Sequence, residues 1–299
     1  MTKALFIINP ISGGKKKERI ASLLGRLLDR DRFDYSIAWT EYAGHAVELA
    51  RDCDATLVVA VGGDGTVSEV ARGIIAASEK GVRKVLGIIP CGSGDGLALH
   101  LGISRRPRKA IAQLNSSAVA TMDYGLVNGQ PFFCTTGVGL DADVADLFAK
   151  SGRRGLITYI TTALKVWMHF EPDTYDISVD GERTVTPAVF VTAGNANQWG
   201  NRARITPLAS VSDGLLDLSV VLPFRSVFIP GLVLKLMTGR ADSSRFMRSF
   251  RGSDILVRRS IAGAAHFDGD PVAMGTEIRI KSVAGALRVA VPANKLNRI

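Results

Sequence analysis

The sequence is poor in cysteine, and its three cysteines lie far apart. Cys53, Cys91 and Cys134 form no CxxC pair, and an odd number gives no disulfide framework. The four histidines are also scattered and make no metal-ligand pattern. A disulfide-stapled domain and a zinc site are therefore not expected, and a reducing, cytoplasmic setting fits best.

Long hydrophobic runs are missing as well. The longest, Ser226–Leu234, is closed off by Arg225 and Lys235 and falls well short of the ~20 apolar residues of a membrane span. The first apolar run, Ala4–Ile8, is too short for the core of a signal peptide. We expect any membrane contact to be peripheral.

Several common catalytic and binding motifs do not occur. There is no Walker pattern GxxxxGK[ST], no clean GxGxxG after the first predicted strand and no GxSxG. Aromatic residues make up only 7% of the chain, and few lie among its basic clusters. An ordinary P-loop enzyme, a standard NAD-binding Rossmann domain and a hydrolase are disfavoured, and no nucleic-acid partner is expected.

The chain does contain enough residues for two domains and a strong excess of positive charge. It has 299 residues and a formal net charge of +9. A basic protein suits an anionic partner such as a membrane surface or a phosphate-bearing ligand, although solubility alone can also explain the charge.

Strand and helix patterns alternate over residues 1–122. Short apolar runs predict strands, and apolar residues at helical spacing predict helices between them. The strands are expected at 4–8, 35–39, 55–61 and 85–89, and the helices at 15–30, 44–53, 67–75 and 105–114. This alternation predicts a doubly wound α/β domain with a parallel sheet.

From residue 123 to about 286 strand-like runs dominate. They are expected at 124–127, 132–136, 175–179, 188–193, 216–221, 254–257 and 277–281, with a further run at 287–291. Asn128-Gly129 and Asp180-Gly181 are hairpin-turn signals. One helical insert, about 154–169, interrupts the pattern. We predict a second, antiparallel β domain.

Three glycine-containing loops follow predicted parallel strands. They are Asn9-Pro10-Ile11-Ser12-Gly13-Gly14, Gly62-Gly63-Asp64-Gly65-Thr66 and Cys91-Gly92-Ser93-Gly94-Asp95-Gly96. Ligands of doubly wound sheets bind at this edge, glycines let the backbone approach a phosphate, and helix N-termini present free N–H groups. One such loop is often only a turn, but three at one edge favour a phosphate site.

Asp64 is unusual inside a loop of this kind. A carboxylate repels a phosphate unless Mg²⁺ lies between them or the carboxylate takes a proton. It could instead form an Asx turn with its own loop.

Acidic residues also punctuate the second half. Asp268 and Asp270 flank a glycine, which is typical of a hairpin turn but could also place a general base on a loop. Asp213 and Asp217 precede and open the predicted strand 216–221, where a carboxylate with nearby carbonyls could hold a hard cation. Asp141 similarly follows a predicted strand.

Together these motifs resemble the diacylglycerol kinase catalytic-domain family of lipid kinases, which includes bacterial diacylglycerol kinases and sphingosine kinases. The resemblance covers nearly the whole chain, and NAD kinases share only the GGDGT loop. Six short motifs carry it in order: Asn9-Pro10-x-Ser12-Gly13, Gly62–Thr66 with Glu69, Pro90-x-Gly92-Ser93-Gly94, Gly139–Ala142, Asp213–Asp217 and Asp268–Pro271.

The resemblance implies an α/β ATP-binding domain and a β-sandwich domain with the active site between them. It also implies that the last residues, about 287–299, pack back on the first domain. The expected reaction is transfer of the γ-phosphoryl of Mg-ATP to a lipid hydroxyl. The residues implied to bind ATP are Asn9, Ser12, Gly13, Thr40, Gly62, Gly63, Asp64, Gly65, Thr66, Glu69, Gly92, Ser93 and Gly94.

The resemblance also implies roles for the acidic residues. Asp268 would be the catalytic base, by likeness to the bacterial members, and Asp64 is its rival, by likeness to the sphingosine kinases. A structural Mg²⁺ would sit on Asp213 with the carbonyls of Ser210 and Leu215. Asp123 and Asp270 would complete the acidic, Mg²⁺-linked set.

The chain departs from the family pattern in places. Ser68 and Asp95 stand where asparagine is usual, Asp270 stands for a more common glutamate, and Asn201-Arg202 replaces a frequent glycine pair. The first two could alter ATP affinity. None removes a carboxylate with a proposed role, so activity is expected.

The basic surface suits a lipid partner at an anionic membrane, and a homodimer is possible. The stretch from Arg153 to Phe170, basic and then amphipathic, is either part of a membrane face or an ordinary core helix. A soluble kinase, such as an NAD kinase, and a catalytically silent nucleotide-binding protein stay open as alternatives. The identity of the lipid is also open.

Overall fold

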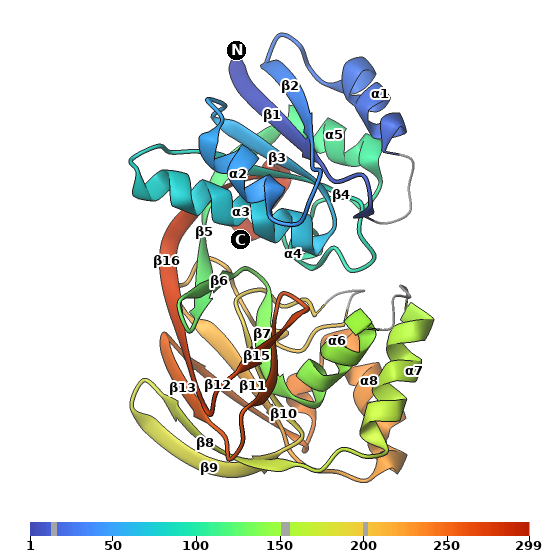
Figure 1. Cartoon of the computed structure of the whole chain (residues 1–299), viewed down its shortest axis with the longest axis vertical. Helices are drawn as coiled ribbons and strands as arrows, with labels where there is room; N and C mark the ends of the chain where they lie inside the picture. The colour runs from blue at the N-terminus through green and yellow to red at the C-terminus, as the bar shows by residue number, and fades with distance from the viewer. Residues whose placement is uncertain (13–16, 151–155, 200–202, 299) are drawn as a thin grey trace. The chain divides into compact units, whose positions relative to one another are not determined.

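The computed structural model describes residues 1–12, 17–150, 156–199 and 203–298, without the side chains at 148–149, 156–160, 164 and 297–298. The predicted phosphate-loop residue Gly13, the pair Arg153–Arg154 and the pair Asn201–Arg202 lie outside the described residues. The chain divides into two compact units, Met1–Met122 with Gly285–Ile299, and Asp123–Ala284 (Figure 1).

The first unit is built on a parallel sheet in the order β2-β1-β3-β4-β16. Its strands are β1 (Thr2–Ile8), β2 (Phe33–Trp39), β3 (Leu57–Gly62) and β4 (Val85–Pro90), joined by the last part of β16 (Glu277–Pro292). Its helices are α1 (Glu18–Leu27), α2 (His45–Asp52), α3 (Asp64–Glu79), α4 (Gly96–His100) and α5 (Pro107–Asn115), followed by the 3₁₀ helix η4 (Ala293–Arg298).

The helices cover the sheet in pairs. Helix α2 packs on α3, and α1 packs on α5 (Figure 1). Every residue of β3 and β4 is buried, as expected for strands covered on both faces. The predicted doubly wound α/β class is confirmed.

Within the residues that the structure describes, the second unit contains antiparallel sheets and three helices. Its strands are the end of β5 (Ser117–Val127), β6 (Gln130–Phe132), β7 (Thr135–Gly139), β8 (Asp173–Val179), β9 (Glu182–Ala188), β10 (Phe190–Gly194), β11 (Leu216–Val221), β12 (Met247–Gly252), β13 (Asp254–Arg258), β14 (Gly263–Phe267), β15 (Asp270–Met274) and the start of β16. Its helices are α6 (Leu140–Lys150), α7 (Leu156–Trp167) and α8 (Ile229–Thr238), with 3₁₀ turns η2 (Ser226–Phe228) and η3 (Ala241–Ser243).

A shared apolar core makes the second unit a β-sandwich. One sheet runs β12-β11-β10-β7-β14-β15, and the other side is formed by β16-β13-β8-β9. Buried side chains from both, such as Leu218 of β11 and Ile255 of β13, belong to one cluster. The predicted β-sandwich class is therefore confirmed.

Several details of the predicted elements differ from the structure. The strand predicted at 132–136 is broken into β6 and β7, because the backbone N–H groups of Phe133 and Cys134 bond to a side chain. The helical insert predicted at about 154–169 is α7, but it is not the single helix of this unit, because the described residues also form α6 and α8. The runs at 277–281 and 287–291 form one strand, β16, in which Gly285 adopts a left-handed φ of 58°.

No helix in the part of the chain that the structure describes is long and apolar enough to cross a membrane.

Candidate active site

The first loop is tied to the second by a side-chain hydrogen bond. Asn9 follows β1, and its Nδ2 donates to Oγ1 of Thr66 at 3.1 Å. Its Oδ1 accepts the N–H of Ile11, and the buried Ser12 hydroxyl donates to the Asn9 carbonyl at 3.3 Å. Asn9 therefore shapes its own loop and holds Thr66 at the same edge of the sheet.

Thr40 and Glu69 lie beside this edge. Thr40 is buried at the end of β2, and its N–H donates to the carbonyl of Ile8, the residue before Asn9. Glu69, on α3, accepts the N–H of Gly44 at 3.0 Å with Oε1. Glu69 thus holds the turn before α2, which is a role that the sequence did not indicate.

The second loop is a tight passage from β3 into a long helix. The strand ends at Gly62 and α3 begins at Asp64, where the carbonyl of Gly63 accepts the N–H of Val67 at 3.1 Å. The Thr66 side chain fills the space where a Cβ at Gly62 would lie. The first turn of an α-helix presents N–H groups that have no carbonyl partner within the helix, which makes this end of α3 suitable for an anion.

The second and third loops touch through their backbones. A Cβ on Gly92 would lie 2.6 Å from the Cα of Gly63 and 2.8 Å from Oδ1 of Asp95. Such distances leave no room for any side chain at this crossing. Both glycines are needed for close approach, which explains their place in the motif.

Asp64 uses both carboxylate oxygens to hold the third loop. Oδ2 accepts the N–H of Asp95 at 2.8 Å, and Oδ1 accepts the N–H of Gly96 at 2.7 Å, at the start of α4. The bonds cross between loops, so Asp64 is not simply an Asx-turn residue of its own loop.

Asp95 fixes the turn in the third loop together with a basic residue that the sequence did not single out. Asp95 has a left-handed φ of 53°, and its buried carboxylate accepts the N–H of Gly92 at 2.7 Å. Nε of Arg105 donates to its other oxygen at 2.9 Å, and Nη2 of Arg105 donates to the carbonyl of Ser93 at 2.8 Å. The aspartate that departs from the family pattern thus has a cationic partner.

In the second unit, Asp268 lies in the two-residue turn between β14 and β15. Asp268 and Gly269 have φ of 52° and 87°, the positive values of a tight hairpin turn. The Asp268 carboxylate accepts the N–H groups of Phe133, Cys134 and Thr135, the shortest being Cys134 at 2.6 Å. The turn and the functional interpretation are therefore compatible.

The protein surroundings make Asp268 a weaker acid. Burial of the carboxylate raises its pKa to about 6, against the opposing effect of the three N–H donors, and the charge of Asp270 raises it further. The residue still keeps part of its surface accessible. A carboxylate that titrates near neutral pH is suited to proton transfer.

Asp123 and Asp268 belong to one network in this unit. Nδ2 of the fully buried Asn195 donates to the carbonyls of Asp123 and Phe133, at 3.0 and 3.1 Å. Phe133 in turn donates to Asp268, and the Asp123 carboxylate accepts the N–H of Gly214 at 2.6 Å. Asn195 was missed by the sequence reasoning, because nothing in its neighbourhood indicates a bridging role.

The remaining acidic residues surround one arginine. Asp213 forms an ion pair with Arg251 and accepts the N–H of Leu215, and Asp217 Oδ2 lies 3.5 Å from Nε of Arg251. Burial raises the pKa of Asp217 to about 6, although Arg251 opposes the shift. Ser210 lies on the same turn, with its hydroxyl against that of Ser212.

No three carboxylate, imidazole or thiol side chains are grouped for metal binding within the described residues. Asp270, proposed with the acidic set, is the exposed first residue of β15.

A separate polar cluster is buried beside β7. Oδ2 of Asp141 accepts the hydroxyl of Thr192 at 2.5 Å and lies 3.1 Å from Nε2 of His266. All three side chains are buried. Asp141 therefore anchors the start of α6 to neighbouring strands.

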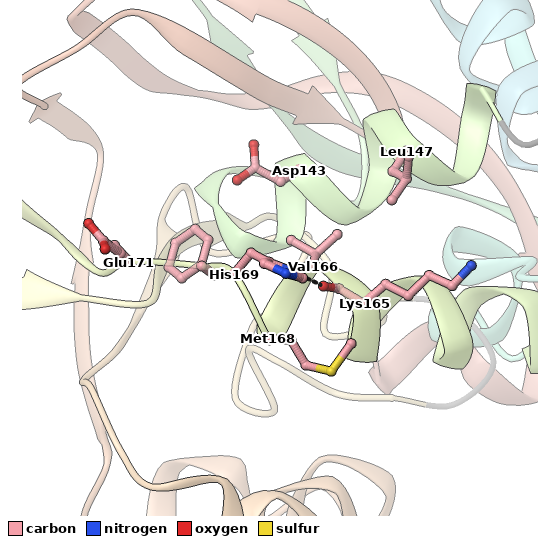
Figure 2. A pocket seen from close by; sticks show the side chains of 8 residues that line it. Asp143, Leu147, Lys165, Val166, Met168, His169 and Glu171 are labelled. Carbon is pink, nitrogen blue, oxygen red and sulfur yellow. Dashed lines mark hydrogen bonds between the residues drawn. The ribbon is translucent and has the colours of Figure 1, made fainter.

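A hollow that contains none of these residues lies elsewhere in the second unit. It is a cavity of about 630 Å³ between α6 and the end of α7, and none of its lining residues is a predicted site residue. Figure 2 shows Asp143 and Leu147 on α6, and Lys165, Val166 and Met168 on and just after α7. The lining combines charged and apolar side chains, as an amphiphilic ligand would require.

Two sequence families match the chain. The diacylglycerol kinase catalytic domain matches residues 3–127. The YegS C-terminal NAD kinase beta sandwich-like domain matches residues 134–291, and this second match alone covers more than half of the chain. The chain belongs to the diacylglycerol kinase catalytic-domain family of lipid kinases. Membership confirms the resemblance on which the predicted fold and site rested.

Relatives of this lipid kinase family are similar over most of their length. The chain is 28% identical over 256 residues to a Chromohalobacter salexigens protein named "Probable lipid kinase YegS-like", covering 83% of this chain and 81% of that one. It is 28% identical over 228 residues to the diacylglycerol kinase of Bacillus subtilis, covering 74% of each.

Solved structures share the fold. A Bacillus anthracis structure of the diacylglycerol kinase type is 23% identical, with a TM-score of 0.79 over 98% of both chains. An NAD kinase from Archaeoglobus fulgidus in complex with ATP is 15% identical, with a TM-score of 0.57 over 99% of this chain and 96% of that one.

Proposed function

We propose that the protein transfers the γ-phosphoryl group of Mg-ATP to a hydroxyl group of a lipid. The observation that carries the proposal is the carboxylate of Asp268, which three backbone N–H groups orient and whose pKa is raised to about 6. A general base works best when its pKa lies near the operating pH, so that it is ionised yet can still accept a proton.

The three loops at the edge of the parallel sheet are the proposed ATP site. Hydrogen bonds and backbone contacts join them into one layer, through Asn9 and Thr66, Gly63 and Gly92, and Asp64 and Gly96. Phosphoryl transfer depends mostly on positioning and on stabilising charge. Preformed loops that offer backbone N–H groups supply both.

The acidic residues of the second unit fit a hard cation. Oδ2 of Asp217 is buried, accepts no hydrogen bond and lies 3.5 Å from Nε of Arg251, which also pairs with Asp213, so a bound cation would take the place of Arg251. Oxygen donors of this kind are the preferred ligands of Mg²⁺. Asp213, with the carbonyls of Ser210 and Leu215, would hold a structural Mg²⁺, and Asp123 would support the same turn through Gly214.

Mg²⁺ bound with ATP would offset the charge of the phosphates. The protein residues have separate tasks. The loops bind and orient the phosphates, and Asp268 accepts the proton of the attacking hydroxyl.

Asp64 is assigned a positioning role in this proposal. Both of its oxygens already accept N–H groups of the third loop, so its loss should disturb the ATP site. Asp64→Asn is expected to raise the KM for ATP, whereas Asp268→Asn should lower kcat with little change in that KM. The opposite pattern would make Asp64 the base.

A lipid acceptor is supported by the relatives and by the amphiphilic cavity. The B. subtilis relative is named a diacylglycerol kinase, and the cavity between α6 and α7 combines Leu147 and Met168 with Asp143 and Lys165. Diacylglycerol, a sphingoid base and other lipid alcohols would all present a hydroxyl next to an apolar chain.

The proposal is tested by transfer of labelled γ-phosphate from Mg-ATP into lipids extracted in detergent micelles. Wild type should label a lipid, which mass spectrometry then identifies. Asp268→Asn should abolish the labelling while preserving the turn, because asparagine also tolerates a left-handed φ. Asp176→Asn, at an aspartate of β8 that pairs with Arg183 and has no part in this network, is the matched control and should retain activity.

Two outcomes would contradict the proposal. Labelling of NAD or another soluble acceptor, with no lipid product, would indicate a soluble kinase. ATP binding without transfer to any acceptor would indicate a catalytically silent nucleotide-binding protein.

A further inference from the structure

Helix α8 is apolar on two faces, and only one of them is covered. Leu232 is buried and Leu236 partly buried in a cluster with β10 and β11. On the other side, Val233, Leu234 and Met237 are exposed, Leu234 by 65%. Positions 230, 233, 234 and 237 are three or four apart, so they form one face of the helix.

The exposed face continues into the 3₁₀ turn before the helix. Val227 is exposed by 74% and Phe228 by 37%. We call Val227, Phe228, Val233, Leu234 and Met237 the η2–α8 patch. A soluble protein rarely leaves so many large apolar side chains together in water, so the patch calls for an occupant.

The segment that carries the η2–α8 patch is rich in basic residues. Residues 225–248 contain five basic residues, Arg225, Lys235, Arg240, Arg245 and Arg248, against one acidic residue, Asp242. The four arginines are exposed. Exposed apolar side chains in a segment rich in basic residues are typical of segments that lie in the interface of an anionic bilayer.

Aromatic residues support the patch from one side. Arg245 lies over the rings of Phe228 and Phe246, 4.9 and 4.8 Å from their centroids. Nε1 of Trp167 donates to the hydroxyl of Ser226 at 2.9 Å, and its ring is 4.8 Å from that of Phe224. Trp167, Phe224 and Arg225 line a cavity of about 350 Å³ beside η2.

We propose that the η2–α8 patch docks the protein on the surface of an anionic lipid bilayer. The inference extends the proposed function, on which its biological purpose rests, because a lipid kinase must reach a substrate that resides in a membrane. At ten residues, α8 is too short to span a bilayer and would lie in the interfacial plane. The excess of arginine distinguishes this occupant from a second copy of the chain, whose identical patch would bring like charges together.

Co-sedimentation with vesicles tests the docking without any turnover. Wild type should bind vesicles of phosphatidylcholine mixed with phosphatidylglycerol more tightly than vesicles of phosphatidylcholine alone. The double variant Leu234→Gln/Met237→Gln should bind about tenfold less tightly or worse, since two apolar side chains no longer enter the interface. Val185→Gln, on β9, is the matched control, because Val185 is also exposed, by 57%, and should bind as wild type does.

The charges are tested separately. Arg240→Gln and Arg248→Gln should each weaken binding to the anionic vesicles by about fivefold and leave the weak binding to neutral vesicles unchanged. Salt should reduce the difference between the two vesicle types.

Three results would overturn the docking proposal. Wild type could fail to bind anionic vesicles, or the double variant could bind them as wild type does. The third result is a wild-type dimer in analytical ultracentrifugation that the double variant does not form, with vesicle binding unchanged. It would show that the patch binds a second copy of the chain. Phosphorylation of lipid in detergent micelles should be the same for wild type and double variant. Failure of the proposed function would therefore appear in that assay and not in the vesicle assay.

Discussion

At the scale of single residues, backbone N–H groups orient three carboxylates of the candidate active site. Asp268 accepts three such groups, Asp64 two and Asp123 one. Each donor belongs to a segment distant in sequence, so the carboxylate both takes its orientation from the fold and joins two parts of it. Short motifs containing glycine and aspartate therefore serve structure and the proposed chemistry together.

The raised pKa of Asp268 predicts how activity depends on pH. Because the base must be ionised, kcat/KM of wild type should rise with pH and level off above about pH 6. Asp268→Asn should lower kcat by about 10²–10⁴-fold and remove this limb. Asp270→Asn should move the limb to lower pH, because the charge of Asp270 raises the pKa of Asp268. If kcat/KM of Asp268→Asn still rose over the same pH range, the rise would be due to the titration of another group.

The pair of Asp95 and Arg105 predicts a rescue. Arg105→Gln leaves the buried Asp95 carboxylate without its cation, and should destabilise folding by about 1–2 kcal/mol and raise the KM for ATP. The loss is less than for a fully buried pair, because the Arg105 side chain is 39% exposed.

Adding Asp95→Asn should restore much of both losses. An amide has no charge to compensate, and its oxygen can still accept the N–H of Gly92. Thermal unfolding and ATP kinetics of the two single variants and the double variant measure the coupling. Additive losses would show that the two residues act independently.

At the scale of elements, strand-end loops determine the proposed ATP site. Continuous apolar runs predicted β3 and β4, which are buried on both faces, and helical spacing predicted every α-helix of the first unit except the short α4. These patterns could not show that Gly63 and Gly92 meet, since the approach depends on the order of β3 and β4 in the sheet.

The crossing of these loops predicts an intolerant position. Gly92→Ala should prevent the approach of the two loops, lower the melting temperature and abolish measurable ATP binding by calorimetry. Gly25→Ala is the control in the same unit. Gly25 lies in α1, and the nearest atom to a Cβ there would be Oη of Tyr35 at 3.6 Å, an ordinary contact distance. Alanine should therefore stabilise that helix by about 0.5–1 kcal/mol. Normal ATP binding by Gly92→Ala would show that the crossing is not needed.

At the scale of the whole molecule, the first unit is assembled from both ends of the chain. Strand β16 begins in the second unit and ends in the first, where Val289 pairs with Leu86 of β4. Leu287, Val289 and Val291 are buried. The first unit is therefore incomplete without residues that follow it by more than a hundred positions.

This connection predicts the behaviour of fragments. Residues 1–122 alone should lack a cooperative urea transition, because β4 would expose an unpaired apolar edge. Residues 1–122 joined through a flexible linker to 285–299 should regain the transition. Far-UV circular dichroism during urea titration measures both. A cooperative transition in the shorter fragment would show that the returning strand is dispensable.

Local patterns settled the classes of structure and the positions of the loops. Apolar period, glycine turns and isolated aspartates are properties of neighbouring residues, and short-range sterics and burial act on them directly. They sufficed for a doubly wound unit and an antiparallel β domain, and the motifs carried the family resemblance that implied the β-sandwich. They did not separate β6 from β7, because the break is imposed by Asp268, more than 130 residues later.

Contacts between residues that are distant in the sequence could be found only in the tertiary structure. The bridge of Asn195 between Asp123 and Phe133, the cation that Arg105 supplies to Asp95 and the raised pKa of Asp268 each need distant segments brought together. The exposure of α8 is a further case. Its sequence is apolar enough for a core helix, and only the packing of its neighbours shows that one face stays in water.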